Sequence, residues 1–178
     1  MKGLCAMRNI FCHEDPVTDI IEMFEMQHPS ARTFFIIGAP GSGKTALLCA
    51  LKEHFDADPA WHVISLAPDA DMLAAASAAL PPLGVPCYEP GVRLKFQIRR
   101  EAEDGKRVIF LVDDVCNNFY AQMFCSHFQV LVRESLPVFF VIAGAPENID
   151  ALKNHKTITF LWRVPRIYLN ADTRKEEN

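Results

Sequence analysis

The sequence predicts a three-layer α/β sandwich, in which helices cover both faces of a parallel, five-stranded sheet. Two observations lead to this class. Apolar runs of strand length alternate along the chain with segments of helical periodicity, and helical crossovers keep the strands that they join parallel. A glycine-rich octapeptide also lies between the first apolar run and the helix after it, and it fits the pattern G-x-x-x-x-G-K-[ST] without a mismatch.

The elements of the first half follow from capping residues and periodicity. Asp15 and Pro16 predict the start of a short helix, because Asp caps helices and Pro fits the first turn. The expected apolar side of this helix consists of Ile20, Ile21, Phe24 and Met26. The pattern then predicts two strands and two helices, in the order 33–37 (strand), 45–55 (helix), 61–66 (strand) and 71–80 (helix).

Residues 92–98, which follow a Pro- and Gly-rich loop predicted over 83–91, are ambiguous. Their apolar residues alternate with polar ones, which is typical of a strand. Leu94, Ile98 and Ala102 also lie four apart, which suits a helix. We favour a helix, because the residues after Ile98 are strong helix formers and a crossover is needed here to keep the sheet parallel.

The second half begins with the clearest strand, over 107–112, whose five successive apolar residues indicate burial on both faces. A helix is expected over 118–134, with a core stripe of Tyr120, Met123, Phe124, Phe128 and Leu131. The remaining elements are a strand, a turn, a short helix and a last strand, expected over 138–143, 144–146, 147–153 and 166–169.

Length and composition predict one globular domain. Its core is expected over 30–170, after an N-terminal segment of 1–29 with the first helix and before a charged, disordered tail of 171–178. A net charge of −4 argues against wholesale electrostatic binding to nucleic acid or to anionic membranes, and no apolar run reaches the length of a membrane span. The six cysteines form no C-x-x-C pair and the first residues do not resemble a signal peptide, which together with a phosphate-binding pattern indicates a reducing cytoplasm.

The octapeptide has the composition of a phosphate-binding loop, the Walker A pattern. Gly41 and Gly43 allow backbone angles closed to other residues, so the N–H groups of the loop can surround a phosphate at the positive end of the next helix. Lys44 would reach the β- and γ-phosphates, and the Thr45 hydroxyl would hold Mg²⁺. The residues expected to bind the nucleotide are Gly38, Ala39, Pro40, Gly41, Ser42, Gly43, Lys44, Thr45 and Ala46.

A second feature of phosphate chemistry, a Walker B pattern, lies at the end of the strand over 107–112. Asp113 follows an apolar run and would sit at the carboxyl edge of the sheet, where open α/β folds bind ligands. We expect it to hold Mg²⁺ together with Thr45. Asp114 would orient or deprotonate an attacking water; the alternatives for it are a solvated turn residue and a helix cap.

These motifs together resemble an AAA+-type P-loop ATPase. The resemblance is carried by the phosphate loop, by Leu111-Val112-Asp113-Asp114, and by residues 136–146 and 159–163. More narrowly, the chain is similar to bacterial and archaeal ATP-binding proteins related to replication initiators and signalling ATPases. The resemblance implies the sheet order 5-1-4-3-2, a preference for ATP, and a catalytic arginine that reaches the nucleotide of a neighbouring subunit. Arg163 and Arg166 match the region of that arginine; the alternative for each is an ordinary surface arginine.

The chain departs from this family in three places. Asp114 stands where relatives commonly have Glu, which is one methylene longer. Ala143-Gly144-Ala145 stands where many relatives have a polar sensor, and Asn148 is the nearest amide. Relatives continue into a helical lid and often a winged helix, for which we expect no room in a chain that ends at Asn178.

We therefore expect Mg²⁺-dependent ATP binding with slow hydrolysis to ADP, with Lys44, Asp114 and Arg163 as the catalytic residues and with self-association or a protein partner completing the site. One alternative is a small-molecule kinase, which would need an arginine-rich lid and an acceptor pocket. Another is a nucleotide-binding module without turnover that binds a protein partner or nucleic acid. The basic residues available for nucleic acid are Arg93, Lys95, Arg99, Arg100, Lys106 and Arg107.

Overall fold

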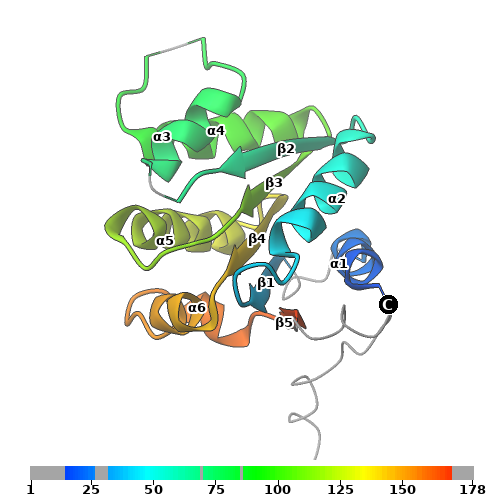
Figure 1. Ribbon diagram of the computed structural model, residues 1–178. Coiled ribbons are helices and arrows are strands. Elements are labelled where there is room, and N and C mark those ends of the chain that lie inside the picture. The colour runs from blue at the N-terminus through cyan, green and yellow to red at the C-terminus, as the bar shows by residue number, and fades with distance from the viewer. Residues whose placement is uncertain (1–14, 27–31, 69, 85, 170–178) are drawn as a thin grey trace, which may run out of the picture.

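The computed structural model describes residues 15–26, 32–68, 70–84 and 86–169, and it shows one parallel sheet between two helical layers (Figure 1). The strands pair in the order β2-β3-β4-β1-β5. This is the predicted order 5-1-4-3-2 counted from the opposite edge, so the predicted sheet is confirmed. The strands are β1 (Thr33–Gly38), β2 (Trp61–Leu66), β3 (Arg107–Val112), β4 (Val138–Gly144) and β5 (Arg166–Leu169).

The helices divide unequally between the two faces of the sheet. In Figure 1, α1 and α2 lie on one side, and α3, α5 and α6 lie on the other. The side chains of α4 belong to the same core cluster as those of α3, α5 and α6. The helices are α1 (Pro16–Glu25), α2 (Lys44–Asp56), α3 (Met72–Ala79), α4 (Pro90–Glu103), α5 (Phe119–Arg133), α6 (Pro146–Lys153) and a short 3-10 helix, η1 (Thr159–Arg163).

Burial on both faces explains why the central strands are almost continuously apolar. Successive side chains of a strand point to opposite faces. On β1, Phe34 and Ile36 join the core cluster beneath α1 and α2, whereas Phe35 and Ile37 join the cluster beneath α3 to α6. Every residue of β4 is buried in the same way. A polar residue at any of these positions would lose its hydration, which accounts for the missing polar alternation.

The ambiguous segment is a helix, as expected, and α4 begins two residues earlier than the predicted start. The cause is Glu89, whose carboxylate caps the helix by accepting hydrogen bonds from the N–H groups of Gly91, at 3.1 Å, and Val92. Pro90 occupies the first helical position, where its missing N–H has no intrahelical partner to lose. The alternation that suggested a strand arises because Val92 and Phe96, four residues apart, stay on the outer face at 44% and 47% exposure.

Two residues that were expected on apolar sides are solvent-exposed. Met26 is 71% exposed because α1 ends at Glu25 and Met26 only caps it, beyond the last turn that contacts the core. Tyr120 is 41% exposed because it lies in the first turn of α5, before the stripe that begins to pack on the sheet. Helix η1 was not predicted as a separate element. The expected disorder of 171–178 and the predicted segment before Asp15 lie outside the described residues.

Helix α1 belongs to the core of the domain. The ring of Phe24 has no solvent exposure and lies 5.1 Å from the Phe34 ring, 6.1 Å from Phe55 and 4.8 Å from Phe139, between ring centroids. These contacts join α1 to β1, α2 and β4 at once. The N-terminal helix is therefore a structural part of the layer that carries α2.

We predict that Phe24→Ala lowers the free energy of unfolding by about 3–5 kcal/mol, because it removes a buried ring and leaves a cavity between α1 and the sheet. Urea denaturation followed by circular dichroism measures this change. Met26→Ala is the matched control at the exposed end of the same helix and should stay within about 0.5 kcal/mol of the parent. A loss below about 1 kcal/mol for Phe24→Ala would show that α1 is not docked as described.

Candidate nucleotide-binding site

The glycine-rich loop joins the end of β1 to the start of α2, at the carboxyl edge of the sheet (Figure 1). Gly41 has φ +79° and Gly43 has φ +95°, both in the left-handed region that favours glycine. Gly43 immediately precedes α2, and no side chain caps the first N–H groups of that helix. These donors are the positive end of the α2 dipole, so the loop has the form of an anion-binding site.

A close approach requires glycine at the start of the loop. A Cβ atom added to Gly38 would lie 2.2 Å from the Ser42 Oγ and 2.9 Å from the carbonyl oxygen of Leu169. Only a residue without a side chain lets the loop fold back over β1 next to β5. The Ser42 Oγ is the one buried side-chain polar atom without a hydrogen-bond partner in the part of the chain that the structure describes.

Lys44 closes the loop on itself. Its side chain is 8% exposed, and its Nζ donates hydrogen bonds to the carbonyl oxygens of Gly38, at 2.8 Å, and Ala39, at 2.9 Å. The ammonium group is thus held beneath the loop at the start of α2, inside the curve of the backbone. A phosphate bound in the loop would share or replace these carbonyl partners.

The two candidate metal ligands meet across the sheet. The Thr45 hydroxyl donates a hydrogen bond of 2.6 Å to the Asp113 Oδ2, although the two residues are 68 positions apart. In the described part of the chain, no group of three or more His, Cys, Asp or Glu side chains could hold a metal ion. Mg²⁺ usually takes one or two carboxylates and completes its octahedron with waters and substrate phosphates, so one carboxylate beside one hydroxyl fits it.

Asp114 lies next to this pair in the sequence and has a left-handed backbone conformation. Its φ of +50° is in the left-handed region, which costs a residue with a side chain about 1–2 kcal/mol. The next residue, Val115, anchors the turn because its N–H donates to the carbonyl oxygen of Ala143 at 2.8 Å. The Asp114 side chain is exposed. Its proposed action on a water molecule stays a prediction.

Arg163 lies toward the opposite end of the sheet from the loop. It is exposed and ends η1, just before β5. Arg166 of β5 is in register with Phe35, near the amino end of β1, whereas the phosphate loop follows the carboxyl end of β1. Because β1 and β5 are parallel, an action of Arg163 on a nucleotide would have to occur on a neighbouring molecule. That role stays a prediction.

Gly144, at the end of β4, lacks space for the polar sensor side chain that the sequence comparison led us to look for there. A Cβ atom on Gly144 would lie 2.9 Å from the Val115 Cγ1 and 3.3 Å from the Ile149 Cδ1. A larger side chain would therefore displace the segment after Asp113. Asn148, the amide nearest in sequence, is half-buried in the first turn of α6.

Sequence reasoning missed a contact between the segments that follow β2 and β3. The Asn118 side-chain amide donates to the Pro68 carbonyl oxygen at 2.7 Å, and its Oδ1 caps α5 by accepting from the Ala121 N–H at 2.9 Å. This ties the segment after β2 to the segment after β3. Asn at the N-cap of a predicted helix could have been found, but its second partner follows only from the tertiary fold.

The basic residues of the α4 region do not form one free stripe. Lys95 and Arg99 both pair with Glu134, the C-cap residue of α5, the latter at 2.7 Å. The hydrogen bond from Lys95 lowers the pKa of the Glu134 carboxyl, and the charges of Lys95 and Arg99 act in the same direction. Arg107 lies 4.2 Å above the ring of Trp61, at the far end of the sheet. No described helix is both long and apolar enough to cross a membrane.

Comparison with known proteins relates the chain to others by fold. No family model and no curated protein match the sequence. Among solved structures, the ORC2 protein of Aeropyrum pernix, in ADPNP-ADP complexes, matches with a TM-score of 0.63 at 13% identity, over 87% of this chain and 47% of that one.

Two further structures agree with this match. Cdc6p of Pyrobaculum aerophilum gives a TM-score of 0.60 at 13% identity, over 90% of this chain and 47% of that one. Drosophila ORC bound to DNA gives 0.59 at 18% identity, over 90% and 43%. The chain spans about half the length of these structures. It therefore shares the P-loop α/β fold of these structures, a five-stranded parallel sheet flanked by helices.

We predict that Gly41→Ala lowers the free energy of unfolding by about 1–2 kcal/mol, because a Cβ in the left-handed region is strained even though open space surrounds it. Gly105→Ala, at φ +76° and equally open, should lose a similar amount. Gly84→Ala, which is open without a positive φ, should be neutral or slightly stabilising. Chemical denaturation of the three variants measures the difference, and equal stability of all three would contradict the loop conformation.

Proposed function

We propose that this chain binds ATP with Mg²⁺ at its glycine-rich loop and hydrolyses the nucleotide slowly to ADP. The observation that carries the proposal is the 2.6 Å contact between the Thr45 hydroxyl and the Asp113 carboxylate, beside the free N–H groups of α2. It supports a metal site next to an anion site, which is the combination that a nucleoside triphosphate with Mg²⁺ requires.

Different residues would contact the phosphates and the metal ion. The N–H groups of the loop and the first turn of α2 surround the β-phosphate, and Lys44 turns from the carbonyl oxygens of Gly38 and Ala39 toward the β- and γ-phosphates. Thr45 and Asp113 hold Mg²⁺, Asp113 through water. When bound, the ion neutralises charge that develops on the phosphate oxygens.

Slow turnover follows from what surrounds this binding centre. An effective hydrolase places a water molecule and usually adds an arginine finger worth about 10³–10⁵ in rate. Asp114 is exposed and its side chain is short, Arg163 lies toward the other end of the sheet, and Gly144 leaves no room for a sensor. A second molecule or a protein partner that supplies an arginine would raise the rate.

ATP is the favoured nucleotide, because the structurally similar Aeropyrum pernix ORC2 protein was solved with ADPNP and ADP. The scattered cysteines and the nucleotide chemistry support a cytoplasmic protein. Kinase activity has less support, since Lys95 and Arg99 are engaged with Glu134 and do not form a lid. The same ion pairs disfavour nucleic-acid binding through α4.

Lys44→Ala should weaken ATP·Mg²⁺ binding about 100-fold or more, since the two or more charge-assisted bonds that it would make are worth about 1.5–3 kcal/mol each. Isothermal titration calorimetry with ATP, ADP and GTP measures the change, and phosphate release reports turnover. Lys52→Ala is the control, because Lys52 lies on the exposed side of the same helix and, among the described residues, forms an ion pair with Asp56 alone. Unchanged ATP affinity in Lys44→Ala would refute the site.

Asp113→Asn should remove most of the Mg²⁺ dependence of ATP binding, because the amide keeps the shape but loses the negative charge that attracts the cation. We expect the ratio of ATP dissociation constants without and with Mg²⁺ to fall about tenfold. Titrations in EDTA and in Mg²⁺ give this ratio. If the variant retained the parental ratio, Asp113 would not be part of the metal site.

A further inference from the structure

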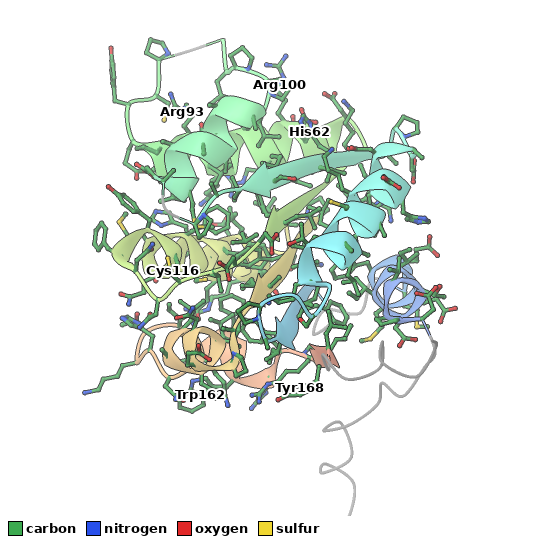
Figure 2. The ribbon with its side chains drawn as sticks, viewed as in Figure 1. His62, Arg93, Arg100, Cys116, Trp162 and Tyr168 are labelled. Carbon is green, nitrogen blue, oxygen red and sulfur yellow. The ribbon has the colours of Figure 1, made fainter. Side chains whose placement is uncertain are left out.

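One pocket lies away from the phosphate loop, between α3, α4 and the loop that joins them. It has a volume of about 540 Å³, within the range of sites for small organic molecules. Its walls include Leu80, Pro82, Leu83 and Pro86, and Arg93 enters it from α4. In Figure 2, Arg93 lies beneath the arch formed by the α3–α4 loop.

A buried hydrogen-bond chain fixes the direction of Arg93. Its Nε donates to the Ser77 Oγ at 2.6 Å, and the Ser77 hydroxyl donates to the Gln97 Oε1 at 2.6 Å. Ser77 and Gln97 are only 3% and 2% exposed. The Gln97 Nε2 in turn donates to the carbonyl oxygens of Ser77, at 2.9 Å, and Pro81, at 3.0 Å, at the C-terminal end of α3. Arg93, Ser77 and Gln97 are therefore each held in place by a hydrogen bond to another of the three.

The remaining donors of Arg93 are free for a ligand. Its Nε is occupied by Ser77, while neither Nη nitrogen has a hydrogen-bond or ion-pair partner among the described residues. No residue that lines the described pocket is acidic. Because Ser77 occupies the Nε–H of this guanidinium, its two Nη groups remain as donors. Their parallel N–H bonds match the two oxygens of a carboxylate or phosphate.

The walls of the pocket indicate what the anion is attached to. Four of the lining side chains are proline or leucine, and Tyr88, 92% exposed, stands at the rim with an open aromatic face. Such walls favour an apolar or aromatic body over a sugar or an inorganic ion. Arg93 is the one charged residue among those that line the pocket. Arg100, also on α4, donates to the Pro82 carbonyl oxygen, 3.5 Å away, and is not one of the lining residues.

We propose that this pocket is a second ligand site, which binds small molecules that join an apolar or aromatic body to a carboxylate or phosphate monoester, with Arg93 as the anion-binding residue. The site does not depend on the nucleotide function proposed above, since it shares no residue with the phosphate loop or Asp113.

The test is a titration by ¹H–¹⁵N NMR with 3-phenylpropanoate, phenyl phosphate and the neutral 3-phenylpropanamide. We expect the two anions to bind, with shifts at the Arg93 Nε–H and at residues of α3 and α4, and the amide to bind at least roughly tenfold more weakly. The tighter of the two anions identifies the head group. Equal binding of the amide, or no binding of either anion at 10 mM or roughly that concentration, would overturn the proposal.

Variants separate this site from its surroundings. Arg93→Gln should lower the affinity for both anions about tenfold. Arg100→Gln removes the same charge from the same helix and should change these affinities less than about twofold. Arg93→Lys retains the positive charge but lacks the pair of Nη groups, so its affinity for the anions should fall roughly fivefold. This variant keeps the test decisive if Arg93→Gln does not fold. Lys44→Ala should leave the shifts that the anions cause in α3 and α4 unaffected. These shifts therefore report on the pocket separately from the nucleotide site. Unaltered affinity in a folded Arg93 variant would refute the assignment.

Discussion

The hydrogen bond between Thr45 and Asp113 depends on the order and stagger of three strands. β4 lies between β1 and β3, with Ile37 in register with Gly144 and Val112 in register with Ile142. Asp113, the first residue after β3, therefore lies beside the last residues of β4, which have small side chains or none. Because β4 ends in Ala143 and Gly144, nothing bulky separates the hydroxyl of one strand–helix unit from the carboxylate of another. The order and register of the strands thus bring the short side chains of Thr45 and Asp113 together at the candidate metal site.

At the same edge of the sheet, the Lys44 ammonium group is hydrogen-bonded within its own loop. A buried ammonium group is unfavourable unless it is hydrogen-bonded, and Lys44 satisfies this requirement with two carbonyl oxygens of its own loop. Net gains from such bonds are modest, about 1.5–3 kcal/mol when one partner is charged. A triphosphate offers charged oxygens in place of neutral carbonyls, so exchange of partners favours the bound state. The loop is in this sense preorganised in its backbone and rearranges mainly at one side chain.

Much of the fold could be predicted from the sequence, since burial on both faces leaves an unmistakable apolar run. The strands over 61–66, 107–112 and 166–169 have the predicted bounds, and the contact between Thr45 and Asp113 joins a predicted motif to a predicted strand end. What could not be predicted depends on neighbours distant in the chain. The placement of Arg163 toward the far end of the sheet follows from the register of β5, and the orientation of Arg93 follows from a serine on another helix. Local periodicity carries no information on either.

The two candidate sites share the sheet but are joined by few polar contacts. The bond from Asn118 to the Pro68 carbonyl oxygen links the segment after Asp113 to the segment that leads into α3, whose far end borders the pocket of Arg93. A neutral hydrogen bond is worth about 0.5–1.5 kcal/mol, so this link alone can carry no more than about a tenfold change in affinity from one site to the other. Stronger coupling would require α3 itself to shift on the sheet, and its buried Met72, Leu73 and Ala76 oppose that. Ligand binding under the α3–α4 loop is therefore expected to be nearly independent of the nucleotide.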